Sequence, residues 1–181
     1  MQDLVREVEK PSQNLYADLL LAHVGEQRRR PESSPDETSE DLGIRELNQF
    51  LAKTGLRRGE VIFEEGSGLS RDNLTMPSAT VTLLQFMGRH KCARVFLDAL
   101  PVAGVDGTLK HRMKGTPAAG NLRAKTGTLS WANCLSGYVT TAAGEHLIFS
   151  LMVNRHYEAR PARGHLDTIG VLLAGFTGRT V

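Results

Sequence analysis

Few cysteines and no metal-binding pattern set the first limits on this sequence. Cys92 and Cys134 are the only cysteines among 181 residues, they lie far apart, and neither belongs to a Cys-x-x-Cys pair. They cannot define a disulfide framework, and we predict buried, unpaired thiols. The six histidines lack metal-ligand spacing. His90 lies two residues before Cys92, but a zinc site would need two further ligands that the sequence does not offer. We therefore expect no metal and no other cofactor.

Long apolar runs and a strong charge excess are also missing. No stretch approaches the roughly 20 consecutive apolar residues of a membrane-spanning helix, and the formal net charge of +2 gives no electrostatic case for a nucleic-acid partner. The first ten residues, MQDLVREVEK, mix charges and contain no apolar core, so we expect neither a signal peptide nor a transmembrane segment in this chain. With 40% hydrophobic and 23% charged residues, the composition is that of an ordinary globular domain.

Apolar residues at three-to-four-residue spacing predict several helices. The first covers residues 15–24, with Asn14 placed to act as its N-cap and Gly25 placed to end it. Pro77 suits the first turn of another helix. Further helices are predicted over residues 43–56, 94–100 and 164–176. Residues 31–41, PESSPDETSED, are acidic and rich in Ser and Pro, and they predict a mobile loop.

Strand patterns are concentrated in the second half of the chain. A short strand is predicted over residues 59–63, and three longer ones over 122–129, 134–141 and 146–154, the last two joined by a polar turn at 143–145. Helices followed by three sequential strands and a closing helix indicate an α+β fold, in which helices flank an antiparallel sheet.

Three short motifs attract attention, and each has a plain structural reading beside a functional one. Lys125-Thr126-Gly127 places a cation beside glycine on a predicted edge strand, where a lysine also serves simply to keep the edge soluble. Ser12-Gln13-Asn14 precedes an apolar helical run, and such polar residues also occur simply as the start of a helix. The segment GSGLSR from Gly66 is typical of a turn that needs glycine.

Four segments, in order, resemble the D-alanyl-D-alanine carboxypeptidases of the class C low-molecular-mass penicillin-binding type. They are EKPSQNLYADLLLAHVG, GSGLSRDN, LPVAGVDGTLKHRM and LRAKTGTLSWANCLSGYVTTAAGE, which together span Glu9 to about Asn154. The resemblance implies a fold like that of β-lactamases and penicillin-binding transpeptidases, here partial. It also implies a serine-type peptidase, a hydrolase that cleaves peptidoglycan stem peptides through an acyl-enzyme trapped by β-lactams, in the periplasm or elsewhere outside the cytoplasmic membrane. Glu65 stands where the family usually has aspartate.

The same resemblance implies roles for six residues. Ser12 would relay a proton to the leaving amine, and Asn14 would bind the amide on the acyl side of the substrate. Lys125 would contribute positive potential, while the hydroxyls of Thr126 and Thr128 would contact the terminal carboxylate of the substrate. Gly127 would let the substrate backbone approach, running antiparallel to the strand, and the Thr128 N–H would donate to the oxyanion.

The family's nucleophile motif does not occur in these residues. None of the serines is followed three places later by lysine, and the family carries Ser-x-x-Lys upstream of Ser-x-Asn. Residues 1–181 are therefore expected to be the C-terminal part of a single penicillin-binding (DD-peptidase) domain, inactive alone because such residues act as a unit. Two alternatives remain: a non-catalytic fragment or binding module that keeps the substrate-carboxylate pocket, or a fragment that does not fold stably.

Overall fold

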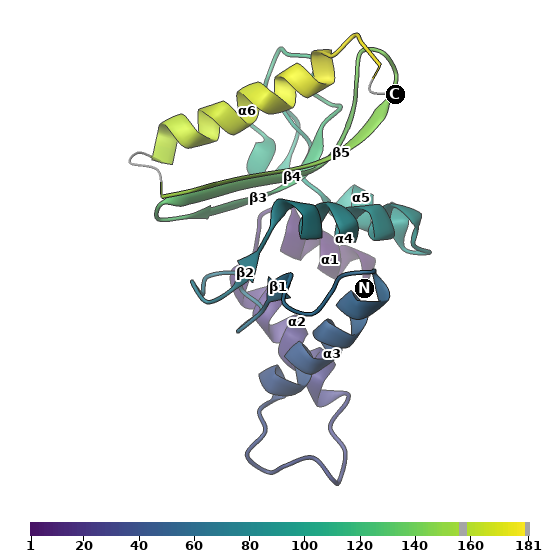
Figure 1. Cartoon of the computed structure of the whole chain (residues 1–181), viewed down its shortest axis with the longest axis vertical. Helices are drawn as coiled ribbons and strands as arrows, with labels where there is room; N and C mark the ends of the chain where they lie inside the picture. Colours follow the sequence, from purple (N-terminus) through teal and green to yellow (C-terminus); the bar gives the residue numbers. More distant parts are fainter. Residues whose placement is uncertain (156–158, 180–181) are drawn as a thin grey trace. The chain divides into compact units, whose positions relative to one another are not determined.

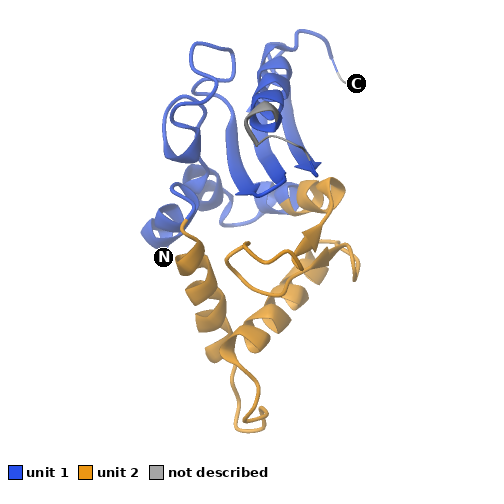
Figure 2. Cartoon of the chain, turned by 90° about the vertical axis from the view of Figure 1, so that its left-hand side faces the viewer, with its two compact units in different colours: residues 1–12, 84–181 blue, residues 13–83 orange. Residues whose placement is uncertain are grey.

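The described part of the chain divides into two compact units. The computed structural model describes residues 1–155 and 159–179. Unit 1 comprises residues 1–12 and 84–181, and unit 2 comprises residues 13–83, as Figure 2 shows. One helix, α4 (Pro77–Arg89), crosses the boundary and contributes to both units.

Unit 1 is built on a three-stranded antiparallel sheet. Its strands are β3 (Arg123–Leu129), β4 (Ala132–Thr140) and β5 (His146–Asn154), in the order β3-β4-β5. Helix α6 (Ala159–Gly175) lies along one face of the sheet (Figure 1). The predicted antiparallel sheet with a closing helix is therefore confirmed, and β3 lies at an edge of the sheet as described.

Side-chain alternation along the strands separates the core from the opposite face of the sheet. Leu135 of β4 is fully buried in the same core cluster as Leu166 of α6. Residues of the other parity in β4 face away from α6. One of them is Tyr138, whose hydroxyl donates to the carbonyl of Leu84 at 2.6 Å and whose pKa is raised to about 12 by burial. Lys125 pairs with Ser136 across the ladder and belongs to this second face.

Short helices complete unit 1. The helix α1 (Gln2–Glu9) packs against α5 (Ala93–Ala99), and the 3-10 turn η1 (Gly107–Leu109) contacts β3. The segment before β3 also covers the beginning of that strand, because Val102 bridges Arg123 and the Ala124 N–H donates to the Pro101 carbonyl at 3.0 Å. The edge of β3 is therefore covered up to Ala124.

Unit 2 consists mainly of a helix pair. Its elements are α2 (Asn14–Glu26), α3 (Ser39–Lys53), the two-stranded ribbon β1 (Val61–Ile62) and β2 (Leu74–Thr75), and the first half of α4. Leu51, Leu56 and Ala79 form its buried core. The predicted loop 31–41 ends early, because Thr38 and Asp41 form a capping box that starts α3 at Ser39.

Two predictions about α2 are wrong. Gln13, not Asn14, occupies the N-cap position. Asn14 is the first residue of the helix, and it is exposed. Gly25 does not end the helix but is buried inside it, with α3 so close that a Cβ atom would collide with the Ser39 carbonyl and lie 2.5 Å from the Gly43 nitrogen. Glycine is needed there for helix packing, not for chain reversal.

The predicted burial of the two cysteines also fails in part. The two cysteines are unpaired, but Cys92 is exposed and only Cys134 is partly buried. Trp131 is 55% exposed and has a φ of +67° in the tight turn between β3 and β4. The geometry of that turn, not burial of the indole, fixes its position. Helix α1 was not predicted at all.

Two helical glycines provide a matched test of the α2–α3 contact. Gly25→Ala is expected to lower the free energy of unfolding by about 1–3 kcal/mol, because the added methyl group overpacks the helix interface. Gly164→Ala in α6, where a Cβ atom meets nothing within 4 Å, is expected to raise it by about 0.5–1 kcal/mol. Urea unfolding measures both changes, and a neutral Gly25→Ala would contradict the proposed close contact.

Candidate functional site

Two sequence motifs 113 residues apart meet in unit 1. The Lys125 ammonium donates to the Ser12 hydroxyl at 2.7 Å and also to the Thr126 carbonyl at 3.0 Å. Lys125 belongs to the edge strand β3, and Ser12 follows α1. Asn14 belongs to unit 2, whereas the Ser12–Lys125 pair is contained in unit 1.

The backbone at Ser12 is held in an uncommon conformation. Its φ is +64°, in the left-handed region that non-glycine residues seldom adopt. Such a conformation costs of order 1–3 kcal/mol and persists only where surrounding contacts enforce it. The residues on its N-terminal side supply those contacts, beginning with Lys10.

Lys10 ties the Ser12 segment to the chain before β3. Its ammonium donates to the Leu100 carbonyl at 2.6 Å and to the Asp106 carboxylate at 2.7 Å, and its side chain is 12% exposed. Its own carbonyl accepts a hydrogen bond from the Thr108 N–H at 3.1 Å. The other Asp106 oxygen accepts from the Val102 N–H at 2.8 Å. Both the backbone and the side chain of Lys10 are therefore fixed two residues before Ser12.

The same network reaches the Lys-Thr-Gly motif from the other side. The Thr126 hydroxyl donates to the Thr108 hydroxyl at 2.9 Å, and the Thr128 hydroxyl donates to Asn133 at 3.3 Å. At Gly127 a Cβ atom would collide with the Cys134 sulfur, so a larger residue there would have to displace the Cys134 side chain. Sequence reasoning had assigned that glycine only to substrate approach.

The backbone of β3 presents alternate amides to its free edge. The Ala124 N–H points away from β4, since it donates to Pro101. Backbone groups of alternate residues in an antiparallel strand point to the same side, so those of Thr126 and Thr128 also face this edge. Beyond Ala124, none of the described strands pairs with that side of β3. A ligand backbone can therefore pair with the edge from Lys125 onward.

Two partly buried acidic groups lie within the electrostatic influence of Lys125. Burial raises the pKa of the Glu9 carboxyl, and the positive charge of Lys125 opposes that rise. Burial likewise raises the pKa of the Cys134 thiol, again opposed by Lys125. A thiol whose pKa exceeds its usual value of about 8.5 stays protonated at neutral pH and is a poor nucleophile.

In unit 2, Glu65 organises the glycine-rich turn. Its carboxylate accepts hydrogen bonds from the backbone N–H groups of Ser67 at 2.5 Å, Gly68 at 2.9 Å and Ser70 at 3.1 Å, and from the Asn73 amide. Burial would raise the pKa of Glu65, but these hydrogen bonds outweigh it and lower the pKa. The structural role of this carboxylate explains why an acidic residue occurs there.

The residues that support the pair, Lys10, Asp106 and Thr108, were not predicted from the sequence. Lys10 and Asp106 occur in the segments EKPSQN and VAGVDGT, which carried the family resemblance without a role for either residue. Their contact joins positions 96 apart in the chain. Among the residues that the structure describes, no group of three or more His, Cys, Asp or Glu side chains converges to hold a metal ion.

The fold is that of the penicillin-binding proteins and β-lactamases. Penicillin binding protein 4 (DacB) from Haemophilus influenzae superposes with a TM-score of 0.80 and 30% identity, covering 94% of this chain and 39% of that one. Another structure of it, complexed with a β-lactam, gives a TM-score of 0.78. A β-lactamase from Sphaerobacter thermophilus, at 20% identity and a TM-score of 0.67, shows the same fold. No described helix is long and apolar enough to cross a membrane.

The chain belongs to the D-Ala-D-Ala carboxypeptidase 3 (S13) family, whose family model matches residues 1–174. It is 36% identical over 174 residues to the D-alanyl-D-alanine carboxypeptidase of Actinomadura sp. (strain R39), covering 93% of this chain and 31% of that protein. It is 34% identical over 157 residues to DacB of H. influenzae, and the match covers 85% of this chain and 32% of that protein. The chain thus spans about a third of the length of the curated relatives it matches.

Removing the Asp106 charge tests the support of Ser12. Asp106→Asn is expected to destabilise unit 1 by about 1.5–3 kcal/mol, because Lys10 keeps a buried ammonium without its anion. Urea unfolding measures the loss, and a double-mutant cycle with Lys10→Met isolates the coupling. Asp98→Asn, in an exposed pair with Arg94 at 3.9 Å, is the control and should leave stability unchanged. Equal effects of the two substitutions would contradict the structural role of Asp106.

The raised pKa of Glu9 predicts a pH dependence. A carboxyl with a higher pKa in the folded than in the unfolded state favours folding when protonated, so its ionisation lowers stability as the pH rises above about 4.5. Glu9→Gln is therefore expected to be more stable than the parent chain at pH 7, and this advantage should disappear at pH 4. Urea unfolding at the two pH values measures the difference. A larger advantage at pH 4 would reverse the assigned sign.

Proposed function

We propose that this chain forms the substrate-carboxylate side of a serine-type D-alanyl-D-alanine carboxypeptidase site. The observation that carries the proposal is the 2.7 Å hydrogen bond between the Lys125 ammonium and the Ser12 hydroxyl. By family membership, the substrate is a peptidoglycan stem peptide, β-lactams are inhibitors, and the enzyme works outside the cytoplasmic membrane. Residues 1–181 are then the C-terminal part of the catalytic domain.

In this proposal Ser12 is the proton relay and Lys125 the electrostatic anchor. The Ser12 oxygen accepts a hydrogen bond from Lys125, so its own O–H remains available to donate to the leaving amine. The ammonium lowers the energy of negative charge on its neighbours, which favours both an anionic ligand and the developing charge of the transition state. By family resemblance, Asn14 is assigned to the amide on the acyl side of the peptide.

The carboxylate is bound by the hydroxyls of Thr126 and Thr128. Each now donates to another side chain, Thr126 to Thr108 and Thr128 to Asn133. An ionised carboxylate accepts only, so both hydroxyls must rotate to donate to the ligand. The Thr128 N–H, on the free edge of β3, is one donor to the oxyanion. Gly127 keeps that edge clear of a side chain.

Acylation needs a nucleophile that these residues do not contain, since no Ser-x-x-Lys motif occurs among them. We therefore assign to this chain alone reversible ligand binding without an acyl-enzyme. The second candidate function, a non-catalytic binding module, is favoured by the same observation, because Ser12 and Lys125 need no nucleophile to hold a peptide carboxylate.

The experiment combines binding with covalent labelling. An acyl-D-alanyl-D-alanine peptide is expected to bind reversibly in calorimetry, and Lys125→Ala should weaken binding about tenfold or more through loss of a charged hydrogen bond. Lys110→Ala removes the same charge from an exposed position and is the control. A fluorescent penicillin is expected to leave no covalent adduct.

Two results would refute the proposal. No measurable peptide binding by the folded chain would remove the assigned carboxylate site. A stable penicillin adduct would show that a nucleophile exists among these residues, and mass spectrometry of the labelled peptide would identify it.

A further inference from the structure

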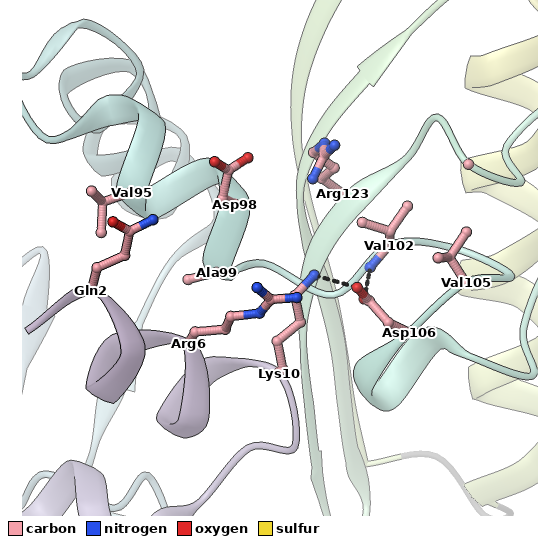
Figure 3. Close-up of a pocket in the computed structure, with 11 residues that line it drawn as sticks. Gln2, Arg6, Lys10, Val95, Asp98, Ala99, Val102, Val105, Asp106 and Arg123 are labelled. Carbon is pink, nitrogen blue, oxygen red and sulfur yellow. Dashed lines mark hydrogen bonds and ion pairs between the residues drawn. The ribbon is translucent and has the colours of Figure 1, made fainter.

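A second recess in unit 1 has no role in the chemistry described so far. It is a cavity of about 400 Å³ between α1, α5 and the beginning of β3 (Figure 3). Ligand sites in proteins commonly have volumes of about 300–1,000 Å³, so this cavity has room for a small organic group.

The cavity carries two guanidinium groups that no carboxylate neutralises directly. Three cations line it, Arg6 and Lys10 from the first segment and Arg123 from β3. Lys10 is paired with Asp106, whereas neither Arg6 nor Arg123 forms an ion pair with any residue that the structure describes. Arg6 acts on Asp106 only at longer range. The local potential is therefore positive.

The rest of the cavity lining consists of aliphatic side chains and one further carboxylate. Val95, Ala99 and Val102 contribute aliphatic surface to the lining (Figure 3). The other carboxylate on the lining, Asp98, lies 3.9 Å from the exposed Arg94 and is itself half exposed. An aliphatic stem that ends in an anion matches this combination of surfaces, and arginine pairs with carboxylates in a planar, two-bond geometry.

The cavity adjoins the Ser12–Lys125 pair along β3. Arg123 and Lys125 are two residues apart on one strand, so their side chains project to the same face about 7 Å from each other. Pro101 and Val102 cover the strand edge up to Ala124, and Val102 also lines the cavity. A ligand that pairs with the free edge from Lys125 onward therefore ends against the cavity wall.

We infer that this cavity is a subsite for a second carboxylate, on an aliphatic side chain of the residue at the carboxyl end of the bound peptide. The direction follows from strand pairing: a peptide antiparallel to β3, which runs from Arg123 to Leu129, points its carboxyl end toward Arg123. That residue is the leaving group. The identity of the ligand as a peptide rests on the proposed function. The ability of the cavity to bind a carboxylate does not depend on that function.

The first arm of the test uses a small probe without the peptide. Glutarate titrated into the isotope-labelled chain is expected to shift the amide resonances of Ala99, Val102 and Gly120 saturably. Arg123→Gln and Arg6→Gln should each weaken this binding at least about fivefold, the loss of a charged hydrogen bond. Arg94→Gln, which removes the same charge from a side chain 94% exposed on the neighbouring helix, is the matched control. Absence of saturable shifts, or equal weakening by all three variants, overturns the subsite.

The second arm tests whether the cavity binds a carboxylate that belongs to the peptide ligand or only a free carboxylate. Acyl-D-alanyl-D-glutamate is expected to bind about tenfold more tightly than acyl-D-alanyl-D-glutamine, its neutral counterpart, and Arg123→Gln should remove the preference. Equal binding of the two peptides overturns the leaving-group assignment. Binding of glutarate but of neither peptide overturns the proposed function while supporting the carboxylate cavity. Thermal unfolding confirms that each variant is folded.

Discussion

The ion pair between Lys10 and Asp106 is the contact on which the candidate site depends. It joins chain positions 96 apart, and it places an ammonium with 12% side-chain exposure against a carboxylate and a main-chain carbonyl. Removing that ammonium from water is costly, and only the combination of charge and hydrogen bonds offsets the cost. Lys10 is fixed two residues before Ser12, and Ser12 adopts a left-handed conformation with a φ of +64°. Its hydroxyl then lies at Lys125.

Structural features that depend on neighbouring residues could be predicted from the sequence, whereas contacts between distant parts of the chain could not. The three long strands and α4 began within two residues of the predicted positions, because alternation and helical periodicity are local signals. Gly25 was misread because glycine ends helices and also permits close helix packing, and only the partner helix distinguishes the two. The predicted fold class is confirmed by the solved structures that superpose on the chain.

The site itself shows the same division. The motifs around Ser12 and Lys125 were recognisable as short patterns, but neither pattern indicated that the two side chains lie 2.7 Å apart. Asp106 and Thr108 lacked any separate signal, since a single aspartate before glycine is typical of turns. Their function in the structure appears only when Lys10 and Thr126 are brought beside them. Support residues of this kind act through tertiary contacts, which no periodic pattern in one sequence records.

Strand direction links the two anion-binding sites that we propose for this chain. Pro101 closes the edge of β3 up to Ala124, so ligand pairing is limited to the portion that begins with Lys125. Lys125 therefore stands at the point where a paired ligand must end, and its charge favours a carboxyl terminus there. The covering segment continues into Asp106, whose charge is neutralised by Lys10 and so does not repel an anion. Without that pairing, the Asp106 carboxylate would weaken the positive potential of both Lys125 and Arg123. The same ion pair thus fixes Ser12 and keeps the surroundings of the ligand positive.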